Sequence, residues 1–316
     1  MPAYLTHYLY GRINYHRMAQ GKVKELIRRH RAVYALGLAG PDIFFYFVPD
    51  YILTHPTAGS IMHEEECGRF LRRMLTESLA ADGEERETAL AYLAGFIGHY
   101  RLDHACHPLV YEYVDREAER LNKSKRNSKN AIHFRLECAL DHYFLEHYAG
   151  KSTADICAYR VTAMSRKEKK CVSRLLADSY NKTYACPNMT VHSVGGVLTC
   201  VQAVLRLIRD KLGRKESVYC LWKRIVHGEP WLEGLFMNDN CYDIDRREWE
   251  KFDKEFRNAM KICRQDYRRL EDLLNAESKE DFRAKKKIFC RKLGDWSYHT
   301  AEKSKNRAFL FEKSDV

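Results

Sequence analysis

Two pairs of side chains of the kinds that bind metal ions stand four residues apart in segments with helical periodicity. His99 precedes Asp103 and His133 precedes Glu137, each in the pattern His-x-x-x-acid. Residues four apart share one face of a helix, and His107 continues the first face by another turn. Imidazole nitrogen and carboxylate oxygen are ligands that zinc takes in catalytic sites. Two such helices facing each other would supply metal ligands from both sides.

Three further candidates lie earlier in the chain, namely His7, Asp42 in a Gly-Pro-Asp turn, and His63. A buried carboxylate costs several kcal/mol unless it is paired or bound to a cation, so Asp42, Asp103 and Glu137 beside apolar residues are informative. A single histidine on an apolar helix face is more often an ordinary core residue than a ligand. The combination of these residues nevertheless predicts a metal site.

The elements expected to position the early candidates are helices. Only 16 glycines and 7 prolines occur in 316 residues, and most lie between periodic segments, which favours an all-α fold. Apolar spacing predicts two helices in residues 1–40, the second ending at the Gly-Pro-Asp turn. An aromatic run at residues 43–47 and a loop marked by Pro49 and Pro56 then lead to a helix that restarts near Ser60.

The later candidates lie on two strongly periodic segments. A long buried helix is expected over residues 84–105, closed by Pro108. A polar, exposed loop over residues 122–130 precedes another helix from Ala131 to about Tyr148. These two helices are expected to face each other.

The chain beyond Gly150 stays helical but has no comparable ligand cluster. Helices are expected over residues 191–212 and 218–226, and a highly charged helix from Arg246 to about Asn275. We therefore expect a multi-helix bundle with a catalytic domain over residues 1–190 and a helical C-terminal extension over residues 191–316, two parts that could share one core.

The balance of charge favours anionic partners. The formal net charge is +11 and the isoelectric point about 9.0, which suits phosphate-bearing substrates, nucleic acid or acidic lipid surfaces. Basic segments at residues 283–287 and 303–307 are interpreted first as solvated helix faces or tail.

Cysteine usage and hydropathy suggest a cytoplasmic protein. The 11 cysteines are odd in number, form no Cys-x-x-Cys pair, and are interpreted as small buried thiols at Cys67, Cys138, Cys171 and Cys200. The first residues do not resemble a secretory signal, and no run approaches the roughly 20 apolar residues that a transmembrane helix needs. Any membrane contact is expected to be peripheral.

The order Thr6-His7, Gly40-Pro41-Asp42, His63, His99-x-x-x-Asp103, His107 and His133-x-x-x-Glu137 resembles the zinc-dependent phospholipase C family, whose fold is shared with tri-zinc single-strand nucleases. The likeness covers roughly residues 1–150 and implies a cofactor of two or three Zn²⁺ ions. It also implies how they are held: one zinc by Asp42, His63 and His99; a second by His7, bridged to the first by Asp103; a third by His107, His133 and Glu137.

The sequence departs from the family pattern at three points. Secreted members also use the amino group and carbonyl of the mature first residue, which lies further ahead of the first histidine than Pro2 lies ahead of His7, so two ions are an alternative to three. The interval from Asp103 to His107 is shorter than usual. His55 competes with His63, which we prefer because Ile-Met-His-Glu-Glu is expected to open a helix.

The chemistry implied is hydrolysis of a phosphodiester, and a phospholipid is one possible substrate. Water held on metal ions at Asp42 and Asp103 would attack the phosphorus, without a side-chain nucleophile. Asp141, Glu64 or Tyr100 could orient the ligand histidines, although each is more often an ordinary polar or packing residue. The aromatic residues 44–47 could line the cleft but are expected to fill the core.

Three other functions remain as alternatives. A single-strand nuclease would use the same metals and the basic surface. A phosphohydrolase of the HD type would need a His-Asp dipeptide, whereas this chain has only the reversed Asp103-His104 and Asp141-His142. A non-catalytic helical scaffold could keep a structural metal and bind acidic partners or a membrane surface through its basic C-terminal helices.

Overall fold

The computed structural model describes residues 4–46, 57–121, 126–184, 189–215, 217–219, 221, 244–298, 300 and 302–305. Over these residues the chain is helical, and the only β-type pairings are two isolated bridges, so the expected all-α fold is confirmed. The main helices are α1 (Tyr4–Arg17), α2 (Lys22–Arg29), α3 (Arg31–Gly37), the 3-10 helix η1 (Gly40–Tyr46), α5 (Ala58–Glu64), α6 (Cys67–Ala80), α7 (Gly83–Arg120), α8 (Arg126–Ala149), the 3-10 helix η2 (Thr153–Asp155), α9 (Ala158–Val161), α10 (Arg166–Asn181), α11 (Val191–Leu207), α13 (Arg246–Leu274) and α14 (Lys279–Leu293).

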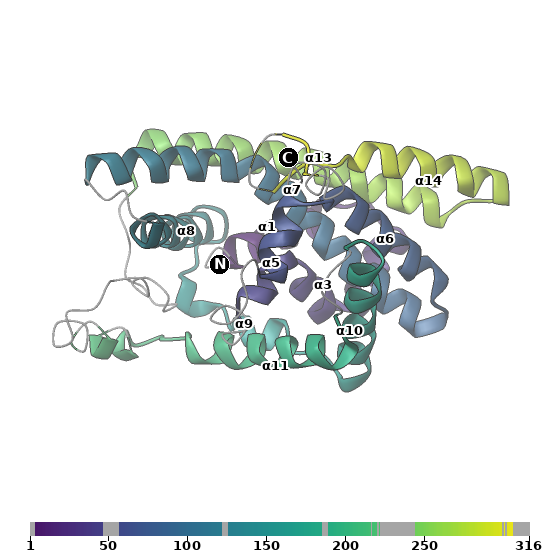
Figure 1. Ribbon diagram of the computed structural model, residues 1–316, viewed down its shortest axis with the longest axis horizontal. Helices are drawn as coiled ribbons and strands as arrows, with labels where there is room; N and C mark the ends of the chain where they lie inside the picture. The colour runs from purple at the N-terminus through teal and green to yellow at the C-terminus, as the bar shows by residue number, and fades with distance from the viewer. Residues whose placement is uncertain are drawn as a thin grey trace, which may run out of the picture.

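Helix α7 is the central element of the fold. Every residue from Thr88 to Asp103 is buried, which is the pattern of a helix surrounded by others. It packs against α3, α6, α8 and α13, and Figure 1 shows α13 alongside it at one edge of the molecule with α10 and α11 at the opposite edge. A Cβ on Gly37 would lie 2.4 Å from the Tyr92 carbonyl oxygen, so glycine lets α3 approach the α7 backbone.

Helix α7 continues through Pro108, and the prediction that this proline closes the helix is wrong. Proline inside a helix costs about 3 kcal/mol because it removes a hydrogen bond and crowds the preceding turn. Beyond it, however, Val110 and Val114 are buried, and burial of a valine contributes about 1.5–3 kcal/mol. Packing of the second half of α7 therefore offsets the penalty, and His107 stays on the same helix as His99.

Two other expected boundaries also differ. The second expected N-terminal helix is divided into α2 and α3 at His30, whose φ of −114° and ψ of 48° leave the helical region while its Nδ1 lies 3.0 Å from Glu168 Oε1 of α10. The predicted loop over 122–130 is shorter, because α8 already begins at Arg126 and Lys129 pairs with Asp115 of α7 at 2.6 Å. That ion pair joins the two helices where the sequence suggested only a polar connection.

The C-terminal helices pack on the same centre. The charged helix α13 occupies residues close to those expected, and its buried Asp266 accepts a hydrogen bond from the buried Arg101 of α7 at 2.6 Å. Helix α11 ends at Leu207, earlier than predicted, and the helix predicted over 218–226 lies largely outside the described residues. Within the described part of the chain, no helix has the length and hydropathy to cross a bilayer.

The described cysteines are all reduced thiols. Cys67 and Cys171 are buried as predicted, whereas Cys138 and Cys200 are partly exposed, so the prediction that they are buried is wrong. The chain therefore shows no disulfide among its described residues.

Candidate metal centre

Three of the candidate ligands project from one face of α7. His99 Nε2 lies 3.0 Å from Asp103 Oδ2, and His107 Nδ1 lies 3.4 Å from the same oxygen. The three side chains are buried, and the Asp103 carboxylate stands between the two imidazoles. The helical spacing predicted from the sequence is therefore realised in the structure.

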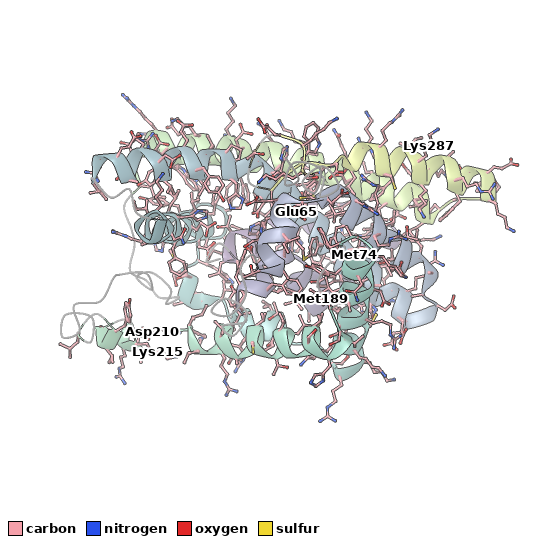
Figure 2. The ribbon with its side chains drawn as sticks, viewed as in Figure 1. Glu65, Met74, Met189, Asp210, Lys215 and Lys287 are labelled. Atoms are coloured by element: carbon pink, nitrogen blue, oxygen red, sulfur yellow. The ribbon has the colours of Figure 1, made fainter. Side chains whose placement is uncertain are left out.

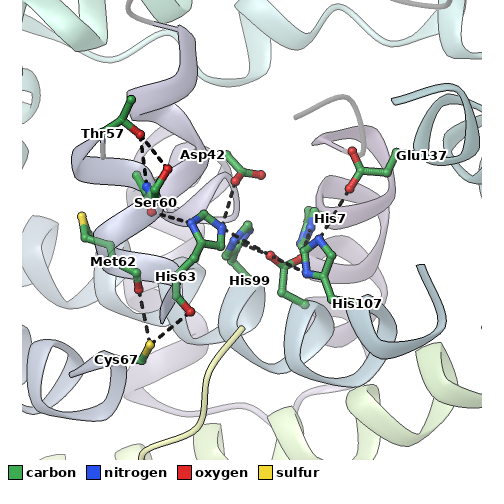
Figure 3. A network of polar contacts seen from close by, with 12 residues as sticks. His7, Asp42, Thr57, Ser60, Met62, His63, Cys67, His99, His107 and Glu137 are labelled. Carbon is green, nitrogen blue, oxygen red and sulfur yellow. Dashed lines mark hydrogen bonds and ion pairs between the residues drawn. The ribbon is translucent and has the colours of Figure 1, made fainter. Parts of the chain in front are cut away.

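Three more candidates approach Asp103 from separate elements. His7 of α1 places Nε2 2.9 Å from Asp103 Oδ1, and His63 of α5 places Nε2 3.7 Å from Asp103 Oδ2. The same His63 nitrogen lies 3.1 Å from Asp42 Oδ1 of η1. Figure 3 shows these side chains directed toward one another, with His63 between Asp42 and the α7 residues.

Helix α8 supplies the last two candidates. His133 Nε2 lies 3.0 Å from Glu137 Oε1, and His107 Nε2 lies 3.6 Å from that oxygen. His107 thus joins the α8 pair to Asp103. Three groups each bring their ligand atoms within 4.8 Å of one another: His7, His99 and Asp103; Asp42, His63 and His99; His107, His133 and Glu137. All eight predicted residues lie in one connected cluster, while His55 lies outside the described residues.

The hydrogen bonds of two histidines reveal their tautomers. His99 Nδ1 lies 3.1 Å from the Leu38 carbonyl oxygen and His63 Nδ1 lies 2.7 Å from that of Gly59. A carbonyl only accepts, so each Nδ1 carries a proton, and a cation bound by the cluster would take the place of any proton on Nε2. His99 Nε2 and Asp103 Oδ2 are buried and meet no hydrogen-bond donor among the described residues. Two facing acceptors of this kind fit a cation that both can bind, and the donor set suits zinc.

The electrostatics of the cluster keep its carboxylates ionised. Burial acts to raise the pKa of Asp42, but hydrogen bonding to His63 and the electrostatic interaction with His99 outweigh it and lower that pKa to about 2. Despite burial, neighbouring imidazoles hold the pKa of Asp103 well below its usual range, and the pKa of Glu137 is also well below its usual range, with His133 and His107 among the groups that lower it. Burial lowers the pKa of His63, yet Asp103 and Asp42 raise it to about 10. Negative charge is thus fixed at the positions that a divalent ion requires.

The turn that carries Asp42 depends on glycine. Gly40 has a φ of +52°, and a Cβ there would lie 2.2 Å from His99 Cδ2. Only glycine allows η1 to adopt this conformation and to lie against the His99 ring. His63 lies in the last turn of α5 rather than at its start, because the Thr57 side chain already accepts a hydrogen bond from Ser60 N at 3.2 Å and begins the helix there.

Asp141 has a different task from the one suggested by the sequence. Its carboxylate accepts hydrogen bonds from Thr6 N at 2.7 Å, Thr6 Oγ1 at 2.6 Å and Leu5 N at 3.2 Å, at the start of α1. Burial raises the pKa of Asp141 to about 8, although these bonds act to lower it. Asp141 therefore fixes the beginning of α1, and with it His7, to helix α8.

The other two residues proposed to orient ligands also have other partners. Glu64 pairs with Lys305 at 2.6 Å near the surface, and the Tyr100 hydroxyl accepts a hydrogen bond from Trp296 N at 2.9 Å. The second nitrogens of His63 and His99 bond main-chain carbonyls instead, which no side-chain pattern could have indicated.

Aromatic rings surround the cluster. Phe44 and Tyr46 are buried in the core as predicted, whereas the partly exposed Phe45 stacks on His63 with centroids 5.5 Å apart; Phe47 lies outside the described residues. Tyr111 stands 5.9 Å from His107 and 5.6 Å from His133, ring to ring. Tyr111 is not among the residues predicted from the sequence, although its place one turn after His107 on the same helix was a usable signal.

The fold and the cluster together define an all-α protein with a buried centre of imidazoles and carboxylates. Among protein families, the model for zinc-dependent phospholipase C matches residues 4–186. The match covers more than half of the chain, and the protein belongs to the zinc-dependent phospholipase C family, as the residue pattern predicted. Searches of curated proteins and of solved structures gave no match.

Proposed function

We propose that the protein hydrolyses a phosphodiester bond, with phospholipid as the substrate class, using zinc bound by the eight clustered residues. The observation that carries this proposal is the convergence of side chains from α1, η1, α5, α7 and α8 in one cluster that includes Asp103. Family membership supports hydrolysis of the phospholipase C type and the choice of zinc.

The three ligand groups support two or three zinc ions. Asp42, His63 and His99 would hold one ion, and His107, His133 and Glu137 another. His7 would share a further position with Asp103, whose two oxygens face His7 and His99 respectively. When bound, zinc acts as a Lewis acid toward the phosphoryl group and lowers the pKa of a bound water molecule to near neutrality.

The chain's own residues prepare the site for an anionic substrate. Main-chain carbonyls hold His63 and His99 so that neither ring turns away, and Asp103 stays ionised between them. At the edges of the cluster the side chains of Asp42 and His133 are 19% and 22% exposed, while those of the central ligands are almost fully buried. No side-chain nucleophile is required.

The proposal is tested by metal analysis and hydrolysis of a nitrophenyl phosphocholine and of phosphatidylcholine vesicles. Asp103→Asn should lose zinc and at least about 100-fold of the activity, because one neutral amide replaces the shared carboxylate. Asp115→Asn is the matched control, since it makes the same change on an exposed part of α7. Zinc-loaded protein without turnover of either substrate would refute hydrolysis and favour a scaffold, and preferential cleavage of single-stranded DNA would refute the substrate class.

A further inference from the structure

The chain that follows α14 returns to the metal centre. Residues 294–298 and 302–305, which we call the C-terminal segment, lie outside the part of the chain matched by the family model. In Figure 1 the yellow trace leaves α14 and turns back toward α5 and α6, and in Figure 2 Glu65 lies close to it near the centre of the molecule. The segment therefore contacts the connection that follows the candidate ligand His63.

Main-chain hydrogen bonds attach the C-terminal segment to that connection. Tyr298 N donates to the His63 carbonyl oxygen at 3.0 Å, and Ser297 Oγ donates to the same oxygen at 3.3 Å. Lys305 N donates to Glu64 O at 2.8 Å, and Glu66 N donates to Lys305 O at 3.0 Å. The backbone of His63 and the three residues after it is thus fixed by residues more than two hundred positions later.

The same segment caps the start of α6. The N-cap residue Glu66 has a φ of 48° and makes no capping hydrogen bond with its own side chain. Instead, Gly68 N donates to Asp295 Oδ1 at 2.8 Å and Cys67 N donates to Ser304 Oγ at 3.3 Å. A carboxylate at a helix N-terminus also interacts favourably with the helix dipole. The capping partners that α6 lacks locally are therefore supplied from the end of the chain.

The Tyr298 ring brings the segment against two candidate ligands. Tyr298 is 1% exposed, and its ring centroid lies 5.0 Å from that of His63 and 5.6 Å from that of His99. His63 belongs to α5 and His99 to α7, so one ring limits the movement of imidazoles from two separate helices. Figure 3 shows the C-terminal ribbon passing beside these two histidines.

We propose that the C-terminal segment is part of the zinc site and that Tyr298 is a positioning residue for His63 and His99. The inference rests on the proposed zinc binding. Ligand rings must be held within about 0.5 Å and 10–20° of the geometry that the metal requires, and outer-shell partners that orient ligands typically contribute about 10–100-fold to metal affinity. The hydrogen bond at Nδ1 holds one edge of the His63 ring and one edge of the His99 ring. Each ring could still tilt about its hydrogen bond, and contact with the Tyr298 ring restricts this tilt.

The test is zinc affinity of the full-length protein, measured by competition with a chromogenic chelator, together with the visible absorption of the Co²⁺-substituted form. Tyr298→Leu should weaken one class of zinc site about 10-fold or more and change the Co²⁺ spectrum. Tyr298→Phe should resemble the wild type, because the ring is kept. The site formed by His107, His133 and Glu137 is the internal reference, and its zinc affinity should not change. Among the described residues Tyr298 makes no ring contact with these three side chains.

Tyr180→Leu is the matched control, because Tyr180 of α10 is equally buried and packs against the ring of Tyr184. Unchanged zinc affinity in folded Tyr298→Leu, or an equal loss in Tyr180→Leu, would overturn the inference. If Tyr298→Leu does not fold, Asp295→Ala removes the α6 cap instead, and unchanged zinc affinity there would also overturn it. If the wild type binds no zinc, the proposed function fails. That outcome is distinguishable from failure of the inference about Tyr298, in which the wild type binds zinc and the Tyr298→Leu variant binds it equally well.

Discussion

Gly40→Ala should disrupt the metal centre more than a glycine replacement with the same backbone conformation elsewhere. Gly40 and Gly83 both have a φ of +52°, so alanine pays the same conformational cost at each, about 1–2 kcal/mol. A Cβ at Gly83 meets nothing within 4 Å, whereas at Gly40 it would lie 2.2 Å from His99 Cδ2 and 2.7 Å from His99 Nε2. Because His99 is fully buried, the collision should add about 1–3 kcal/mol.

The two variants separate the collision from the strain. Chemical unfolding should show a loss of about 1–2 kcal/mol for Gly83→Ala and about 2–5 kcal/mol for Gly40→Ala. Zinc affinity should fall only for Gly40→Ala, because the added methyl group displaces the His99 nitrogen. Equal stabilities together with equal zinc affinities would refute the argument that glycine is needed for η1 to lie against His99.

Three further changes address other parts of the cluster. Glu137→Gln should lower the zinc content after dialysis by one ion per chain, while the site of Asp42, His63 and His99 keeps its zinc. An unchanged zinc content would contradict zinc binding by His107, His133 and Glu137. Asp141→Ala should destabilise the protein by on the order of 2–4 kcal/mol in urea, because three donors of α1 lose their buried acceptor; a loss no larger than that of Asp155→Ala, which removes only a local cap of η2, would argue against this role. The pKa of Asp42 is lowered from 3.8 to about 2, so its contribution to the stability of the metal-free protein is present above pH 3.8 and lost as the pH falls through about 2. Asp42→Asn should therefore flatten the acid limb of a stability–pH profile, and a profile identical to that of the wild type would contradict the pairing with His63.

The sequence was informative where a short period fixes the geometry. The spacing of His99, Asp103 and His107 determines their common face once the segment is helical, and the same holds for His133 and Glu137. Their convergence with His7 and Asp42 followed from the resemblance to a family rather than from spacing. Nothing in the local pattern gives the distance between α1 and α7.

Other features depend on tertiary packing and had no local signal. Pro108 is tolerated because buried residues follow it, and helix α2 ends at His30 because that side chain pairs with Glu168 of α10. The partners of the ligand histidines are carbonyl oxygens, which every residue possesses. Tyr298 stands far from the ligands in sequence, and one buried tyrosine among 20 is not distinguished by its neighbours in the chain.

The most direct test of the central claim is the zinc content of the purified wild-type protein, measured by elemental analysis after zinc loading and removal of free metal. We expect two or three zinc ions per chain, with hydrolysis of phosphatidylcholine lost on chelation and restored by zinc. Less than one ion per chain under these conditions, in protein shown to be folded, would contradict the account, because the clustered imidazoles and carboxylates would then not form a zinc site.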